Sequence, residues 1–292
     1  MTGPVMAITR DGSRVHMQHG PIDLIVEAWG DAAGVTEAYR RAWERFQPLL
    51  DELVAELPAL RRPVGRASAA LSGAALSGAV ARRMAAAVRP FADGVVTPMA
   101  AVAGAVADEI LETMVTAGGL RRAYVNDGGD IALHLAPGES LEVGLVPLPH
   151  RAALAARATI RWEDPVRGVA TSGRHGRSFS LGIADAVTVL AASSARADAA
   201  ATLIANAVDL PGHRAIERVP ACDLAPDSDL GDRPVTVGVG TLTPGEVSRA
   251  LGAGVEEAGR MRGEGSIEAA VVFLQGRVAM VATPVLASAA GG

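Results

Sequence analysis

The sequence predicts an α+β protein in which antiparallel sheets pack with several helices. Segments with helical spacing and segments of strand-like residues come in blocks rather than in strict alternation, which favours α+β over a doubly wound parallel sheet. Short turns such as Asp11-Gly12 and Gln275-Gly276 separate neighbouring strand-like runs and indicate hairpins. Of the 292 residues, 49% are hydrophobic, enough to bury a sizeable core in one large or two small domains.

The N-terminal part of the chain begins with strands and continues with helices. Apolar runs on both sides of Asp11-Gly12 predict a hairpin over 5–9 and 14–18, followed by a strand over 22–29. Apolar residues at helical spacing predict the helices that follow. Prolines close the first two helices, a proline opens the third, and two glycines end it. These helices are expected at 35–57, 68–88 and 99–116.

The remainder of the chain is richer in strands. Runs of apolar and β-branched residues predict strands at 122–125, 131–135, 141–145, 158–162, 169–171, 186–191 and 235–239. Helices are expected at 194–208 and 244–261, the second opened by Thr243, with a polar loop at 223–234 between them. A last hairpin is expected over 268–274 and 277–283. No linker or repeat interrupts this pattern, so the sequence predicts a single domain over 1–292.

The composition excludes several classes of protein. The formal net charge is -5, whereas proteins that bind nucleic acid generally need clustered cations. The single cysteine, Cys222, excludes an intramolecular disulfide and a cysteine-rich metal site. The sequence contains no lysine. It therefore lacks a lysine that could form a Schiff base or bind phosphate as in a Walker motif.

Neither the start of the chain nor its small-residue run indicates export or a membrane. The first residues lack the basic segment and apolar stretch of a signal peptide. The run of small residues at 67–81 is shorter than the about 20 apolar residues that cross a bilayer, and an internal helix is the better interpretation. We therefore expect a soluble, cytoplasmic protein with no membrane or nucleic-acid partner.

The first stretch that can carry chemistry is Asn-Asp-Gly-Gly-Asp at 126–130. Its glycines allow positive φ and the close approach of a ligand to the backbone, while Asn126 and Asp130 bring oxygen acceptors to the same edge. An ordinary polar hairpin turn explains the same residues, because glycine, asparagine and aspartate dominate turns for conformational reasons. Both interpretations remain open from the local sequence.

The second stretch is Thr-Ser-Gly-Arg-His-Gly-Arg at 171–177, at the end of a predicted strand. Hydroxyls, backbone N–H groups and the guanidinium groups of Arg174 and Arg177 suit a phosphate or pyrophosphate. A solvated loop with a surface histidine, His175, is the alternative. Asp185, just before the next strand, is either a turn residue or a carboxylate of the same site.

The third stretch is Ala-Asp-Ala-Ala-Ala-Thr at 197–202, inside a predicted helix. Asp198 and Thr202 are four residues apart, so their oxygens lie on one helical face with only alanines between them. A carboxylate and a hydroxyl suit a hard cation such as Mg²⁺. The alternative is structural, because aspartate is favoured near a helix start and threonine can bond its own helix backbone.

In their order along the chain, these stretches resemble the ApbE family of FAD:protein FMN transferases. That family shows a helix with K-G-x-A-x-D, then an N-x-G-G-D turn, a T-S-G strand end, and an S-V-T-V strand that leads into an A-D-A-x-x-T helix. The corresponding segments here lie within a core of about 95–210. The residues that match the ligand-lining motifs are Gly104, Asp108, Asn126, Gly128, Gly129, Asp130, Thr171, Ser172 and Gly173.

The resemblance implies an ApbE-like fold and a Mg²⁺-dependent enzyme that acts on FAD, by FMN transfer or by pyrophosphate cleavage. It implies that Asp198 and Thr202 bind Mg²⁺, that the glycine turns and the T-S-G segment line the flavin dinucleotide, and that a protein acceptor is possible. The residues left as candidates for the base or for charge stabilisation are Asp185, His175, Arg174 and Arg177.

Two departures from the family pattern keep other functions open. Ala103 stands at the lysine position, and the H-x-x-D-P segment is missing between T-S-G and the next strand. One alternative is therefore a flavin or nucleotide carrier that kept the pocket and lost transfer activity. Another is a structural partner subunit without a small ligand.

Overall fold

The computed structural model describes residues 3–10, 12–65, 76–92, 96–146, 156–281 and 286–288. The chain forms two compact units. Unit 1 comprises Met1–Leu141, Ile160–Val169 and Ala192–Asp198. Unit 2 comprises Glu142–Thr159, Ala170–Ala191 and Ala199–Gly292.

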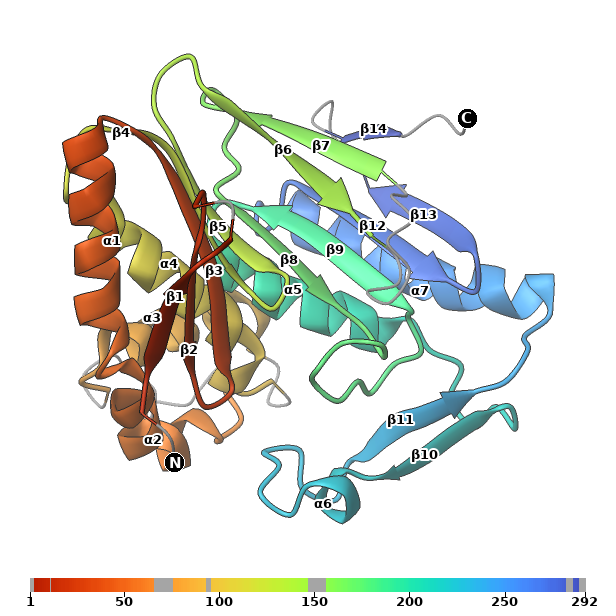
Figure 1. The fold of residues 1–292 in the computed structure, drawn as a ribbon. Helices are drawn as coiled ribbons and strands as arrows, with labels where there is room; N and C mark the ends of the chain where they lie inside the picture. Colours follow the sequence, from red (N-terminus) through yellow and green to blue (C-terminus); the bar gives the residue numbers. More distant parts are fainter. Residues whose placement is uncertain are drawn as a thin grey trace. The chain divides into compact units, whose positions relative to one another are not determined.

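Unit 1 contains an antiparallel sheet in the order β1-β2-β3-β4-β5 (Figure 1). Its strands are β1 (Val5–Ile8), β2 (Val15–His19), β3 (Ile22–Gly30), β4 (Leu120–Asp127) and β5 (Asp130–Leu135). The first residues of β8 (Gly168–Ser172) pair with β5, with Val169 opposite Ile131. Alternate residues of the strands, among them Met17, Leu24 and Val125, are buried, as expected for a sheet with one face in the core.

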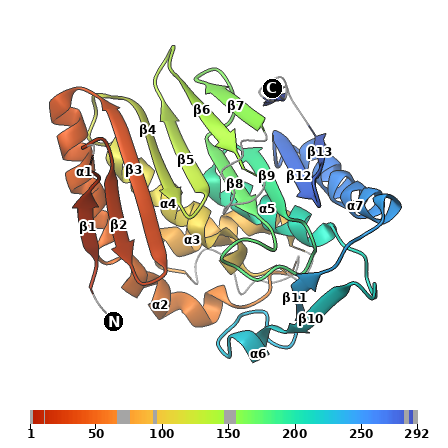
Figure 2. The same cartoon turned by 45° about the vertical axis from the view of Figure 1, so that its right-hand side comes forward.

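Helices of unit 1 cover that buried face (Figure 2). They are α1 (Ala32–Phe46), α2 (Leu49–Leu60), α3 (Ala79–Val88) and α4 (Val102–Val115), with the short 3-10 turns η2 (Arg89–Phe91) and η3 (Pro98–Ala101). Most of α4 is buried, because it packs on β4 and β5 on one side and on α1 and α3 on the others. The most buried helix of unit 1 is thus the one that carries the predicted ligand residues Gly104 and Asp108.

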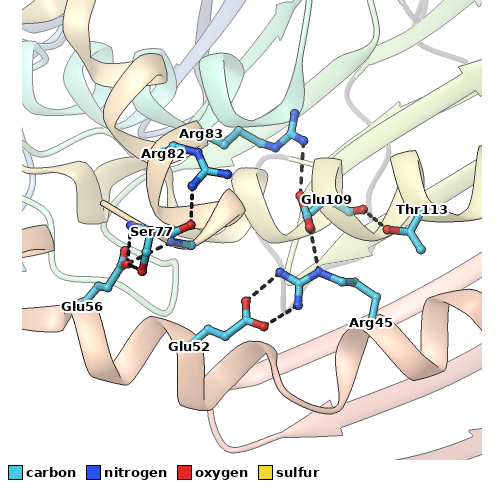
Figure 3. A network of polar contacts seen from close by, with 9 residues as sticks. Arg45, Glu52, Glu56, Ser77, Arg82, Arg83, Glu109 and Thr113 are labelled. Carbon is cyan, nitrogen blue, oxygen red and sulfur yellow. Dashed lines mark hydrogen bonds and ion pairs between the residues drawn. The ribbon is translucent and has the colours of Figure 1, made fainter. Parts of the chain in front are cut away.

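A network of charged side chains fixes α4 against the neighbouring helices (Figure 3). Glu109 of α4 accepts a hydrogen bond from Nε of Arg45 at 2.7 Å and lies 3.4 Å from Nη2 of Arg83. Arg45 also donates to both carboxylate oxygens of Glu52, at 3.1 and 2.8 Å. Because Glu109 is buried, loss of both arginines would leave a costly unpaired charge.

The structure corrects the predicted helix boundaries in two places. The single helix expected at 35–57 is two helices, because Pro48 stands at the N-cap of α2, where its missing N–H costs nothing. Pro58 does not end α2, which continues to Leu60, a fully buried residue of its apolar face. The helix expected at 68–88 is present from Ala79 onward, and residues 66–75 lie outside the described residues.

Unit 2 contains separate antiparallel groups of strands. One is β9-β12-β13, made of β9 (Ala186–Ala191), β12 (Ala269–Leu274) and β13 (Arg277–Val281). Another is the hairpin of β10 (Ile216–Pro220) and β11 (Pro234–Val239), which the sequence analysis anticipated only in its second strand. A third has the order β14-β7-β6, from β14 (Leu286–Ser288), β7 (Ala156–Arg161) and β6 (Ser140–Leu145), the last two of which begin or end in unit 1.

Three helices accompany these strands. They are α5 (Ser194–Ala207), which starts in unit 1, the short α6 (Ala221–Leu224), and α7 (Pro244–Gly263), which packs on β12 and β13. Thr243 opens α7 as predicted, since its hydroxyl accepts from the N–H of Glu246 and the Glu246 carboxylate accepts from the N–H of Thr243. This reciprocal pair is a capping box.

The structure confirms the α+β class with antiparallel sheets. The hairpin expected around Asp11-Gly12 is formed by β1 and β2, although Asp11 itself lies outside the described residues. That 1–292 form a single domain stays a prediction. Among the helices of the described residues, none is long and apolar enough to cross a membrane.

Candidate functional site

The turn at 126–130 is a tight two-residue hairpin between β4 and β5. Asp127 pairs with Asp130, and the loop consists of Gly128 and Gly129 with φ of 63° and 118°. Both angles lie in the region that glycine adopts without a steric cost, so the turn requires these glycines. The side-chain oxygen of Asn126 accepts from the N–H of Gly129 at 2.8 Å and closes the turn. Conformation alone therefore explains Asn126 and both glycines.

Conformation does not explain the two aspartates of this turn. Carboxylates at a hairpin tip normally point into water, because a buried charge is expensive. Here Asp127 is only 4% exposed and Asp130 only 9%. Both have interaction partners. The turn therefore places acidic side chains inside unit 1, as a cation or ligand site would need.

Asp198 of α5 belongs to the same acidic cluster. Its Oδ2 accepts from the N–H of Gly104 at 3.0 Å, and the backbone of Ala103 also hydrogen-bonds the carboxylate. Burial, together with the smaller effects of the charges of Asp127 and Asp108, raises the pKa of Asp198 to about 7 against the two backbone hydrogen bonds, which lower it. The neighbouring carboxylates thus oppose the ionisation of Asp198 within unit 1.

Asp108 of α4 contacts the start of α5, just as Asp198 of α5 contacts the start of α4. Its carboxylate oxygens accept from the N–H groups of Ser194 and Ala195 at 3.0 and 2.9 Å. Burial raises the pKa of Asp108, while these backbone bonds and the charge of Arg83 oppose the shift. Both oxygens are therefore engaged with the start of α5, which is a structural role for a residue that the sequence analysis assigned to cofactor binding.

Gly104 has a packing role for the same reason. A Cβ built on Gly104 would lie 2.4 Å from the carbonyl oxygen of Ser194, well inside van der Waals contact. The first turns of α4 and α5 can therefore approach each other only because residue 104 has no side chain. This close approach lets Asp108 and Asp198 each reach the other helix.

The predicted Mg²⁺ pair fits the chemistry of the cluster in part. Burial and, to a smaller extent, the neighbouring charge of Asp127 raise the pKa of Asp198, and a divalent cation would offset both effects. In the described part of the chain, however, no group of three or more His, Cys, Asp or Glu side chains is arranged to hold a metal ion. Thr202 is half-buried and belongs to unit 2. A bound Mg²⁺ would therefore take most of its ligands from water and phosphate, as Mg²⁺ commonly does.

The T-S-G segment of unit 2 ends β8 and contacts the start of β9. The hydroxyls of Thr171 and Thr188 share a hydrogen bond of 2.9 Å. Gly173 has a φ of 148°, and a Cβ there would lie 2.6 Å from the carbonyl oxygen of Asp185. The glycine is thus required by the backbone, while Ser172 stays half-buried at the strand end.

The structure brings three of the four candidate catalytic residues together in unit 2. Oδ1 of Asp185 accepts from Nε and Nη2 of Arg174 at 2.9 and 2.7 Å, and Nε2 of His175 lies 3.3 Å from the same oxygen. Oδ2 of Asp185 accepts from the N–H of Gln275 at 2.5 Å. Arg177, the fourth candidate, is exposed.

The sequence analysis missed several residues of these two clusters. Asp127 stood in the candidate turn but not among the residues assigned to ligand binding, although it continues the buried alternation of β4 two residues after Val125. Gln275 was read only as part of a turn, and no local signal connects it with Asp185. Thr188 lies within the strand expected at 186–191, and no local signal predicts its bond to Thr171.

Curated proteins of archaea match part of this chain. The "UPF0280 protein" of Archaeoglobus fulgidus is 39% identical over 126 residues, which are 42% of this chain and 49% of that protein. The "UPF0280 protein" of Methanopyrus kandleri is 38% identical over 127 residues, 44% of this chain and 48% of that protein. The chain thus spans about half the length of the curated relatives it matches.

Solved structures show a more distant similarity. The crystal structure of the ApbE protein of Thermotoga maritima covers 91% of this chain and 96% of its own, with a TM-score of 0.49 and 11% identity. The apo form of the flavinyl transferase ApbE of Pseudomonas stutzeri covers 98% of this chain and 96% of its own, with a TM-score of 0.46 and 12% identity.

The family profile described as "AbpE bacteria" matches residues 6–280, nearly the whole chain. The matched range includes α4 with Asp108, α5 with Asp198, the N-D-G-G-D turn and Asp185. The protein therefore belongs to this ApbE-like family.

Proposed function

We propose that this protein is a Mg²⁺-dependent enzyme that cleaves the pyrophosphate of FAD, releasing AMP and moving FMN to a hydroxyl acceptor or to water. The observation that carries the proposal is the pair of buried carboxylates Asp127 and Asp198, whose charges oppose each other in unit 1. A protein that only needed a hairpin and two packed helices would gain nothing from this repulsion. A bound cation would offset the repulsion between the two carboxylates.

Asp198 and Thr202 are the proposed protein ligands of Mg²⁺. The carboxylate supplies charge and the hydroxyl a neutral oxygen, both of the hard type that Mg²⁺ prefers. When bound, Mg²⁺ would neutralise phosphate oxygens and stabilise the leaving AMP. The hydrogen bonds from Gly104 and Ala103 orient the Asp198 carboxylate for that role.

The flavin nucleotide is proposed from family membership and from the matched motifs. The matched residues proposed to contact the ligand are Asn126, Gly128, Gly129, Asp130, Thr171, Ser172 and Gly173. The guanidinium of Arg174 is of the kind that binds phosphate. Gly104 and Asp108 would support the site through the helix contact described above rather than by touching the ligand.

A carrier function is the second candidate, and a specific observation favours it. Asp108 and Asp198 already have partners in the ends of α5 and α4, so a fold that lost turnover would still need them. The missing H-x-x-D-P segment and the Ala103 substitution point the same way. A protein acceptor, if one exists, would differ from the usual acceptor of the family.

The direct test is the fate of FAD. The purified full chain is incubated with FAD in Mg²⁺ or in excess chelator, and FMN and AMP are separated by chromatography. Release of AMP in Mg²⁺ and not in chelator is expected. Intact FAD that remains bound to the protein would favour the carrier, and intact FAD without binding would favour a structural subunit.

A further inference from the structure

Unit 1 contains a hollow of about 450 Å³ beside the second half of α4. Its walls come from α3, α4, β5, the turn before β8 and the residue before α5, and every residue that lines it belongs to unit 1. Neither Asp127 nor Asp198 is one of these residues. The volume lies in the range of pockets that bind small molecules.

The side chain of Arg167 in this hollow is held in place by its own turn. Its Nη1 donates to the carbonyl oxygens of Asp164 at 2.7 Å and Val166 at 2.5 Å, and its Nη2 donates to that of Trp162 at 2.6 Å. A guanidinium has five N–H donors, so Nε and one N–H of Nη2 remain without a partner in the described part of the chain. Nε and Nη2 form an edge that can bind two oxygens of one carboxylate or phosphate.

The charge of Arg167 has no carboxylate beside it among the described residues. The other charged side chains of the hollow are engaged: Nη2 of Arg83 lies 2.5 Å from Oε2 of Glu112, and the Asp108 carboxylate accepts from the start of α5. Burial lowers the pKa of His134, and the charge of Arg167 lowers it as well. A fixed cation without a counter-charge therefore lies near a histidine that is uncharged at neutral pH.

We propose that this hollow binds the phosphate group of a small organic molecule. Nε and Nη2 of Arg167 would donate to two phosphate oxygens, and Arg83, whose Nε is a buried donor without a partner, would add a second cation. Two cations favour a phosphate dianion over a single carboxylate. The hollow is also lined by Leu111, Val115 and Leu133, which suit an apolar organic part. None of these five residues belongs to the proposed Mg²⁺ and FAD site.

A purely structural role for Arg167 predicts a different result. In that case the side chain only closes the turn at 162–166, and its replacement lowers the melting temperature without any ligand being involved. Glu112 provides a test that leaves Arg167 intact. The Glu112 side chain is 68% exposed and competes with phosphate for Arg83. Glu112→Gln is therefore expected to raise phosphate affinity by roughly 1.5- to 5-fold, the range of an exposed ion pair.

The experiment is calorimetric titration of the full chain with phenyl phosphate and, separately, with inorganic phosphate. A chelator and a phosphate-free buffer keep Mg²⁺ and competing phosphate out of the measurement. Phenyl phosphate is expected to bind the wild type more tightly than inorganic phosphate, because of the apolar wall. Arg167→Gln is expected to lower its affinity by about tenfold or more, because a charge-assisted contact to two oxygens is lost.

Two other arginines provide matched controls for charge and for site. Arg121→Gln removes a cation of unit 1 whose side chain is 65% exposed and does not line the hollow. Arg174→Gln removes the arginine proposed above to bind the phosphate of FAD. Both variants are expected to bind phenyl phosphate as the wild type does. Equal loss of affinity in Arg121→Gln and Arg167→Gln, or loss of binding in Arg174→Gln, would overturn the proposal.

The remaining outcomes are equally decisive. A wild type that binds neither probe, an Arg167→Gln variant with wild-type affinity, or a wild type that binds inorganic phosphate as tightly as phenyl phosphate would overturn the proposal. Circular dichroism shows whether each variant is folded. Should Arg167→Gln not fold, the Glu112→Gln variant decides: a raised affinity for phenyl phosphate supports the site, and an unchanged or lowered affinity contradicts it.

Discussion

The carboxylates of Asp108 and Asp198 each bind the amino end of the helix that carries the other. Asp108 on α4 accepts from the first N–H groups of α5, and Asp198 on α5 accepts from N–H groups at the start of α4. The exchange satisfies donors that the first turn of a helix leaves open, and it places negative charge at the positive ends of two helix dipoles. The acidic cluster is therefore built before any ligand binds.

Asp108→Asn is expected to lower the free energy of unfolding. Asparagine keeps one acceptor and turns an NH₂ group toward a buried backbone N–H, so about 1–2 kcal/mol of unfolding free energy should be lost. Urea unfolding measures this loss. Asp51→Asn, at an exposed position in the first turn of α2, is the control and should lose less. Equal losses in the two variants would show that the exchange contributes little.

Gly104→Ala is expected to be strongly destabilising. The new methyl group would lie 2.4 Å from the Ser194 carbonyl oxygen, so α4 and α5 would have to move apart at a cost of about 1–3 kcal/mol. Gly259→Ala on α7 is the matched control, because a Cβ there meets nothing within 4 Å. That variant should gain about 0.5–1 kcal/mol from helix propensity. Thermal melts that shift in the same direction for both would contradict this packing argument.

The fold class was predictable because it depends on local signals. The Thr243 capping box, the Gly128-Gly129 turn and the alternation of β3 are all visible within a few neighbouring residues. The position of the break at Pro48 could also have been found, since proline is common at a helix start. Pro58 misled the prediction, because the burial of Leu60 keeps the last turn of α2 helical.

Several residues of the two clusters could be named from the sequence, but their contacts could not. The motifs identified Asp108 and Asp198, whereas their exchange of helix ends joins segments distant in the sequence. The same is true of Asp185 and Gln275, which are brought together by the pairing of β9 with β12. A window of neighbouring residues contains no information on such pairs.

The capping box of α7 predicts a defined pH dependence. The N–H of Thr243 and the ring of His213 hold the pKa of Glu246 down to about 2, below the value of about 4.3 for an unfolded chain. Because the folded pKa is the lower one, the stabilisation is complete above about pH 4.3 and is lost as the pH falls through about 2. Glu246→Gln should therefore be less stable than the wild type at pH 6, and the gap should shrink toward pH 3. Urea unfolding across this range checks it, and a gap independent of pH would refute the role of the charge.

The metal role of Asp198 is the central claim, and calorimetric titration of FAD into the wild type and Asp198→Asn, with and without Mg²⁺, tests it most directly. Asparagine keeps the shape of aspartate and removes the full charge that a hard cation requires. We expect Mg²⁺ to strengthen FAD binding to the wild type and to have little effect on FAD binding to the variant. The substitution is expected to weaken Mg²⁺-dependent FAD binding far more than it lowers the melting temperature. Equal FAD affinities for both proteins, with and without Mg²⁺, would contradict it and leave Asp198 with only its role at the amino end of α4.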